Sequence, residues 1–234
     1  MNVKNWIKVK VLEYRATSDS YIAHLRKIGV SIGKGVKIYR PFNTTIDVQA
    51  PHLLSIGNYV QITGPATILN HDYSWSVIKR KYGYIYGSQR KTVIGNNVFI
   101  GWGATILGGT DIGNNVIIGA NSVVSGKVDS NSVYAGNPAR KLMTLDDYYN
   151  KRKCNQLKEA VTFVREYKKR FGKVPPEEKL NEYFFLFKPT HLNAKFKAQM
   201  KLMDNYELSK QLLYKNYQFS SYEKFVEYCD EQTE

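Results

Sequence analysis

The sequence predicts a mainly β fold, a parallel β-helix, followed by an α-helical C-terminal region. The helical region is indicated by a change to helical patterning from Thr144 onward. A helix needs an apolar period of 3.6 residues and an ordinary strand a period of 2, and neither describes the middle of the chain. Aliphatic residues there recur at intervals of six, which is typical of short strands that turn corners and stack coil upon coil. These residues are Ile94, Ile100, Ile106, Ile112, Ile118 and Val124.

The same register continues upstream, where it is less regular. Its members are Ile32, Ile38, Thr44, Ala50, Ile56, Ile62 and Ile68. The residues four positions later are also expected to face the core, namely Val36, Phe42, Val48, Leu54, Val60 and Ala66. Thr44 and Ala50 are weak members, so we expect the coil near Pro51 to be distorted. The β-helix is therefore expected to span residues 30–142.

One insertion interrupts the coils. Ile68 and Ile94 are 26 residues apart, two more than a multiple of six, so the phase breaks once between them. This break predicts an inserted loop over residues 72–91.

The N-terminal segment, residues 1–29, is expected to contain a short helix that covers the open first coil, as terminal repeats of a solenoid require. Asp19 or Ser20 is the expected N-cap, and the helix is expected to run through Lys27. The residues expected on its apolar face are Tyr21, Leu25 and Ile28.

The C-terminal region, residues 143–234, is expected to be an α-helical appendage. A sequence that resembles a capping box begins a helix at Thr144, and two prolines before two acids mark a further helix start at residues 175–178. Two more helices are expected over about 191–215 and 221–231. The apolar run at residues 183–187 must be buried, and we expect it to pack on the last coil or on a neighbouring subunit. Peripheral association of these Lys- and aromatic-rich helices with a membrane is the alternative.

The charge and the cysteines limit the function. The net charge is +14, and residues 1–140 carry +10 of it. Such a surface would attract phosphate-rich coenzyme A, a nucleotide-sugar or an acidic polysaccharide, although it is also compatible with a plain solvated surface. No nucleic-acid-binding module is recognisable in the sequence. Two cysteines without a CxxC motif, and an N-terminus interrupted by lysines, predict a cytoplasmic protein rather than a secreted or membrane-spanning one.

Three stretches resemble the hexapeptide-repeat acetyltransferases and together cover about residues 20–142. They are YIAHLRKIGVSIGKGVKI, the coils from Ile94 to Val128, and SVYAGNPARKL. The GNPAR motif is similar to the ending found in the branch that contains sugar, maltose, galactoside and xenobiotic acetyltransferases. The resemblance implies a left-handed parallel β-helix, a homotrimer, and acetyl-coenzyme A as a co-substrate bound between subunits.

His71 is the candidate catalytic base. It is the only histidine on a coil immediately before the inserted loop, and in the resembled branch a histidine at such a place deprotonates the acceptor. Imidazole titrates near neutral pH, and acetyl-coenzyme A is reactive enough to need no Ser or Cys nucleophile. The γ-class carbonic anhydrases share the fold but need three converging histidines on zinc. No second coil histidine follows His71, so no metal is predicted.

The resemblance also implies contacts with coenzyme A. The matching positions are Trp102, Ala120, Ser125, Lys127 and Arg140. The Trp102 indole would pack against the pantetheine arm, and the Arg140 guanidinium would meet a phosphate. The family commonly has Lys directly after the residue that Ser125 matches. This chain has Gly126 there, which makes Lys127 a shifted candidate for a phosphate contact.

The inserted loop is expected to shape the acceptor pocket, because aromatic side chains stack on sugar rings. It carries five cations and one acid, Asp72, which favours an acceptor with a carboxylate or a phosphate. The cations are Lys79, Arg80, Lys81, Arg90 and Lys91. The residues expected to contact the acceptor are Asn70, Tyr73, Trp75 and Arg80.

The sequence thus predicts an acyltransferase that transfers acetyl from acetyl-coenzyme A to a sugar hydroxyl in capsule, O-antigen or other glycan synthesis. N-acetylation of an amino sugar and acetylation of an antibiotic are alternatives within this class. A non-catalytic β-helix scaffold is the alternative from another class. A scaffold has no reason to keep both His71 beside a loop and Arg140 in GNPAR, so the pattern favours an enzyme.

Overall fold

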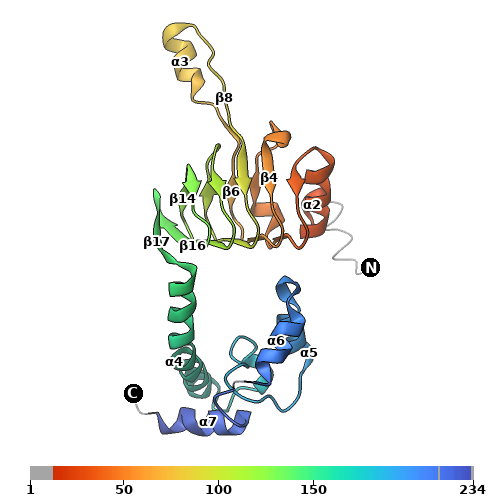
Figure 1. Cartoon of the computed structure of the whole chain (residues 1–234), viewed down its shortest axis with the longest axis vertical. Helices are drawn as coiled ribbons and strands as arrows, with labels where there is room; N and C mark the ends of the chain where they lie inside the picture. The colour runs from red at the N-terminus through yellow and green to blue at the C-terminus, as the bar shows by residue number, and fades with distance from the viewer. Residues whose placement is uncertain (1–12, 216, 233–234) are drawn as a thin grey trace. The chain divides into compact units, whose positions relative to one another are not determined.

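The computed structural model describes residues 13–215 and 217–232 of the chain. It divides into two compact units, Met1–Tyr148 and Tyr149–Glu234. The first unit holds the strands and the second holds most of the helices (Figure 1).

Parallel sheets make up the first unit, and the chain visits three of them in rotation. The five-stranded sheet contains β1 (Ser31–Ile32), β4 (Leu54–Ile56), β9 (Thr92–Ile94), β12 (Asp111–Ile112) and β15 (Lys127–Val128). The six-stranded sheet contains β2 (Lys37–Ile38), β5 (Gln61–Ile62), β10 (Val98–Ile100), β13 (Val116–Ile118), β16 (Ser132–Gly136) and the antiparallel β17 (Ala139–Thr144). The four-stranded sheet contains β3 (Thr45–Ile46), β6 (Thr67–Ile68), β11 (Thr105–Ile106) and β14 (Val123–Val124).

The predicted aliphatic residues form columns through these sheets. In the six-stranded sheet Ile62 pairs with Ile100, which pairs with Ile118, and all three side chains are fully buried. Successive side chains of a strand point to opposite faces of the sheet, so residues paired in register point to the same face. Ile62, Ile100 and Ile118 therefore all point into the core. The six-residue spacing therefore predicted this core correctly from Ile94 to Val124.

The upstream coil departs from the predicted register. Ile46 pairs with Ile68 and occupies the aliphatic column, and Thr44 fills the buried position two residues before it. Phe42 and Val48, expected to face the core, are 57% and 48% exposed. The physical reason is a pair of inserted 3₁₀ turns, η2 (Pro41–Asn43) and η3 (Pro51–Leu53), which shift the phase at Ile46 and restore it at Ile56.

The predicted insertion is a β-hairpin that carries a helix. It consists of β7 (His71–Asp72), α3 (Trp75–Tyr82) and β8 (Ser88–Gln89). The helix α3 extends beyond the ends of the sheet strands (Figure 1) and stops at Gly83, whose φ of 83° is in the left-handed region.

Stacked asparagines show the spacing of the coils. The backbone N–H of Asn96 donates to Oδ1 of Asn114, 18 positions later. The N–H of Asn58 donates likewise to Oδ1 of Asn96, but across 38 positions, because the insertion lies between them. The coils on both sides of the insertion therefore keep the same contacts.

At the N-terminal end of the unit, α2 (Ser18–Lys27) follows the 3₁₀ helix η1 (Glu13–Arg15). The N-cap is Thr17, not the predicted Asp19 or Ser20, and Ser20 completes its capping box. Thr17 is the N-cap because its extended backbone lets its hydroxyl accept from the N–H of Ser20 at 3.1 Å. The rest of the predicted N-terminal segment, residues 1–12, lies outside the described residues.

The C-terminal helices differ from the prediction in their type and limits. At the start of the first helix Thr144 N–H donates to Oδ2 of Asp147 and Asp147 N–H donates to Oγ1 of Thr144, as predicted. Residues 175–178, however, begin only the 3₁₀ helix η4 (Glu177–Lys179). The helix predicted over 191–215 is broken at Met203, whose φ is 61°. The remaining elements are α4 (Leu145–Phe171), α5 (Ala194–Met200), η5 (Leu202–Asp204), α6 (Tyr206–Leu213) and α7 (Tyr222–Glu231).

The second unit has its own hydrophobic core, which corrects the expected burial of residues 183–187. Phe184 stacks on Phe196 with ring centroids 4.5 Å apart, and the fully buried Phe187 packs on Phe225 at 5.5 Å. These partners all belong to the C-terminal region, so Phe184, Leu186 and Phe187 are buried without a coil or a second subunit, and Tyr183 and Phe185 are partly buried. Among the described residues, no helix is both long enough and apolar enough to span a bilayer.

Candidate active site

His71 lies where the chain leaves the four-stranded sheet and enters the inserted hairpin. Its side chain is 28% exposed and lines a pocket of about 290 Å³. The pocket is lined by Gln49, His71, Asp72, Tyr73, Trp75, Gly87, Ser88 and Gln89. The predicted catalytic residue therefore stands at an open pocket.

Asp47 is the hydrogen-bond partner of His71. Oδ2 of Asp47 accepts from Nδ1 of His71, and the Asp47 side chain is only 5% exposed. The same oxygen accepts from the backbone N–H groups of Asn70 and His71 at 3.0 and 3.1 Å. Because the imidazole Nδ1–H is held by a carboxylate, the neutral ring keeps a lone pair on Nε2, and Nε2 can serve as a base.

Two opposing effects act on the pKa of Asp47. Burial raises the pKa, because it disfavours the charged form. Donation from the N–H groups of Gln49 and Asn70, and from His71, more than offsets burial and lowers the pKa below its usual value. Asp47 is therefore a carboxylate at neutral pH.

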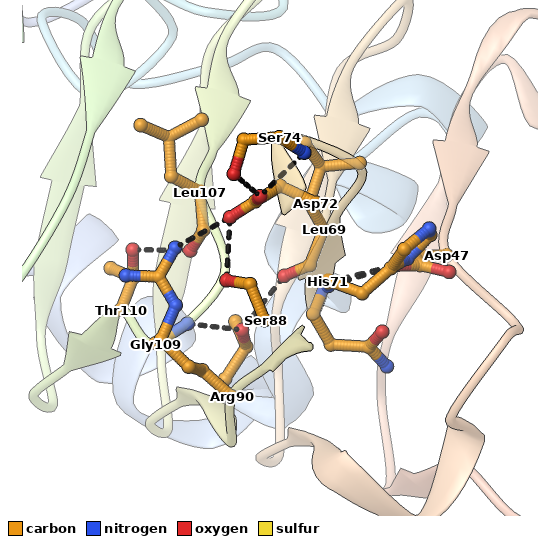
Figure 2. A network of polar contacts seen from close by, with 12 residues as sticks. Asp47, Leu69, His71, Asp72, Ser74, Ser88, Arg90, Leu107, Gly109 and Thr110 are labelled. Carbon is orange, nitrogen blue, oxygen red and sulfur yellow. Dashed lines mark hydrogen bonds and ion pairs between the residues drawn. The ribbon is translucent and has the colours of Figure 1, made fainter. Parts of the chain in front are cut away.

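Asp72 holds the base of the hairpin together. Its Oδ1 accepts from the N–H of Ser74 at 3.1 Å and from the Ser74 hydroxyl, and its Oδ2 accepts from Ser88 Oγ at 2.6 Å. Arg90 Nη2 lies 3.3 Å from Oδ2. The Ser74 and Ser88 bonds lower the pKa of Asp72 to about 2. Figure 2 shows this carboxylate between Ser74, Ser88 and Arg90, with His71 directed toward Asp47 beside it.

The predicted acceptor residues separate into two groups. Tyr73 and Trp75 line the pocket with ring centroids 4.5 Å apart. Asn70 is fully buried, and its Nδ2 donates to the carbonyl of Ala50 at 2.7 Å. Its side chain therefore stabilises the coil beside His71 and is not accessible to an acceptor. Arg80 is exposed on α3 and is not one of the lining residues. Arg80 lies on α3, which extends beyond the ends of the sheet strands (Figure 1).

The predicted coenzyme A residues fall on two different edges of the coils. Trp102 and Ala120 follow β10 and β13, where the chain leaves the six-stranded sheet, and Asn121 N–H donates to the Trp102 carbonyl at 2.7 Å. Ser125 follows β14 and Lys127 lies on β15, so both are beside the edge where the chain leaves the four-stranded sheet. His71 leaves the four-stranded sheet at that same edge.

Trp102 and Arg140 are accessible on their edge. The Trp102 side chain is 45% exposed, and the guanidinium of Arg40 lies 4.5 Å from its ring centroid. Arg140 lies on β17, paired with Ala135 of β16, and is exposed. An exposed indole and an exposed guanidinium suit a ligand with an apolar arm and phosphates.

Sequence reasoning missed Asp47, Gln49, Ser88 and Gln89. Asp47 had a signal, because it directly follows Ile46. A register that used Ile46 as the partner of Ile68 would have placed Asp47 beside Asn70 and His71. Ser88 and Gln89 had no such signal in the sequence, since only the β7–β8 pairing brings them opposite Asp72 and His71.

The chain is similar to several known proteins. Residues 91–126 match the family described as bacterial transferase hexapeptide (six repeats). Protein CapG of Staphylococcus aureus is 41% identical over 127 residues, which cover 54% of this chain and 73% of that protein. A hexapeptide-repeat-containing acetyltransferase from Vibrio cholerae is similar in structure, with 20% identity, a TM-score of 0.46 and coverage of 61% of this chain and 89% of the other. A galactoside acetyltransferase in complex with coenzyme A has 20% identity, a TM-score of 0.40 and coverage of 62% and 82%.

Proposed function

Because this chain belongs to the bacterial hexapeptide-repeat transferase family, we propose that it is an acetyl-coenzyme A-dependent O-acetyltransferase of a sugar hydroxyl. The glycan would be a capsule, an O-antigen or a related polymer. The observation that carries this proposal is the His71–Asp47 pair at the edge of a pocket lined by Tyr73 and Trp75.

In the proposed mechanism, His71 is the general base and Asp47 is its positioning residue. Nε2 of His71 removes the proton of the acceptor hydroxyl as the oxygen attacks the thioester carbonyl. The C–S bond then breaks, and the leaving sulfur takes the proton from the imidazolium. Asp47 fixes the Nδ1–H tautomer and stabilises the transient positive charge on the ring.

We assign the reaction to a left-handed β-helix domain, residues 30–142, that works as a homotrimer. The separation of the two edges supports this assembly. His71, Ser125 and Lys127 are at one edge, and Trp102, Ala120 and Arg140 are at another. A site between two subunits would bring both sets to one molecule of acetyl-coenzyme A. Both cysteines of the chain are free, which supports a cytoplasmic location.

Thiol release from acetyl-coenzyme A, measured with a panel of sugars, amino sugars and antibiotics, tests the proposal. We expect release that depends on a sugar hydroxyl, with mass spectrometry showing an added acetyl ester. Amide products would support N-acetylation instead, and no release with any acceptor would favour the scaffold. Light scattering tests the trimer, since a fully active monomer would contradict the shared site.

A further inference from the structure

The pocket beside His71 contains an acid and no cation among its lining residues. Asp72 is ionised at every physiological pH, because hydroxyl donors lower its pKa to about 2. Asp47, directly behind His71, is a second carboxylate. None of the eight lining residues is Lys or Arg. The charge that this chain places next to a bound acceptor therefore comes from carboxylates.

The five cations of the insertion do not offset this charge for an acceptor. Arg90 is directed at Oδ2 of Asp72, so its guanidinium already has an anionic partner (Figure 2). Lys79, Arg80 and Lys81 are exposed residues on α3. Lys91 is exposed at the end of the hairpin. The net positive charge of residues 72–91 is therefore not located at the lining of the pocket.

The groups that are available to a ligand are uncharged. Gln49 and Gln89 contribute side-chain amides, each of which can donate and accept hydrogen bonds. Ser88 donates its hydroxyl proton to Asp72 and keeps its oxygen lone pairs as acceptors. Tyr73 and Trp75 supply aromatic surface at the same pocket. Amides, a hydroxyl and aromatic faces match the hydroxyl groups and the apolar faces of a sugar ring.

We infer that the acceptor ring bound beside His71 is an uncharged sugar, and that the pocket discriminates against uronic acids and phosphorylated sugars. An anionic ring would bring its charge near Asp72 and Asp47 without an uncommitted cation among the lining residues of this chain, and a ligand charge left without a partner is a strong means of rejecting that ligand. This inference rests on the proposed function, which identifies the pocket as the acceptor site.

Direct binding provides a test that does not depend on turnover. Methyl glycosides of glucose, galactose and mannose are titrated into the full-length protein beside the corresponding methyl uronides, with saturation-transfer NMR and calorimetry as readouts. In each pair the two ligands differ only at C6. We expect the best-bound neutral glycoside to bind at least about tenfold more tightly than its uronide, and the preference to weaken as the salt concentration rises.

Two variants locate the discrimination. Gln89 is directly opposite His71 in the β7–β8 hairpin, so Gln89→Lys places a cation in the pocket and should shift the preference toward the uronide by about tenfold. Lys79→Gln, on the exposed face of α3, is the matched control and should leave the preference unchanged.

The outcomes separate the inference from the proposed function. Equal or tighter binding of every uronide, no binding of any ring, or a loss of uronide binding in Lys79→Gln would overturn the inference. A preference for neutral rings without acetyl transfer would contradict the proposed activity and leave the binding preference in place. Acetyl transfer with a preference for uronides would support the proposed activity and overturn the inference about the acceptor ring.

Discussion

The carboxylate of Asp47 accepts a hydrogen bond from the imidazole of His71 although the two residues are 24 positions apart. Parallel pairing of Ile46 with Ile68 brings them together. Asp47 directly follows β3, and His71 lies on β7 at the base of the hairpin, so neither residue lies on the exposed helix α3.

Replacing His71 should remove the base. We expect His71→Ala to lower kcat by about 10²–10⁴-fold and to leave the affinity for acetyl-coenzyme A nearly unchanged. Initial rates of thiol release and equilibrium binding of coenzyme A provide the two measurements. His52→Ala is the matched control, because His52 is exposed in the turn η3. Near-normal turnover of His71→Ala would rule out the assigned base.

Replacing Asp47 should affect the orientation of the base rather than acceptor binding. In Asp47→Asn the charge is lost and the amide can turn its NH₂ toward Nδ1, which favours the wrong tautomer. We expect kcat to fall by about 10²–10⁴-fold with little change in KM. Nitrogen NMR of the imidazole should show the change of tautomer. A variant with the wild-type tautomer and rate would show that Asp47 has only a structural role.

Acid should destabilise the hairpin through Asp72. The pKa of Asp72 in the folded protein is about 2, below the ordinary value of 3.8. The folded state therefore binds fewer protons than the unfolded state in this window. The stabilising contribution is complete above about pH 4 and is lost as the pH falls toward about 2. Thermal unfolding followed by circular dichroism should show a shallower acid dependence in Asp72→Asn. Asp111→Asn, an exposed carboxylate on β12, should keep the wild-type dependence.

The core of the C-terminal unit should depend on Phe187. This side chain is fully buried against Tyr222 and Phe225. We expect Phe187→Ala to reduce the free energy of unfolding of this unit by about 3–5 kcal/mol. Phe171 is 59% exposed, so Phe171→Ala should change it by less than about 0.5 kcal/mol. Urea denaturation of both variants provides the comparison, and equal losses would contradict the buried role of Phe187.

The sequence predicted the coils well because their pattern is local. Each six-residue block contributes one aliphatic side chain to a column, so counting along the chain finds the core from Ile94 onward. The same counting failed between Ile38 and Ile56. Two inserted turns there shift the six-residue phase and then restore it. Counting in sixes therefore selected Thr44 and Ala50 and passed over Ile46, which is the residue that pairs with Ile68.

The rest of the site depends on contacts that no local pattern contains. Asp47 was missed together with Ile46, and Gln89 reaches His71 only through a hairpin whose pairing is not encoded in the six-residue period. Charge counting predicted that the cations of residues 72–91 face the acceptor. In the structure Lys79, Arg80 and Lys81 are exposed on α3, and Arg90 is paired with Asp72.

The spacing of the asparagine column has a consequence for how the enzyme could diversify. The coil between Asn96 and Asn114 closes over 18 positions, and the one between Asn58 and Asn96 closes over 38 across the insertion, with the same hydrogen bond from a backbone N–H to an asparagine Oδ1. For a flexible loop, the entropic cost of closure grows only with the logarithm of its length, so the longer connection costs about 0.7 kcal/mol more. Hairpins of very different length and composition could therefore be exchanged at this one position during evolution. Acceptor preference could change in a single recombination event that replaces the hairpin beyond His71, while the coils and the His71–Asp47 pair stay as they are.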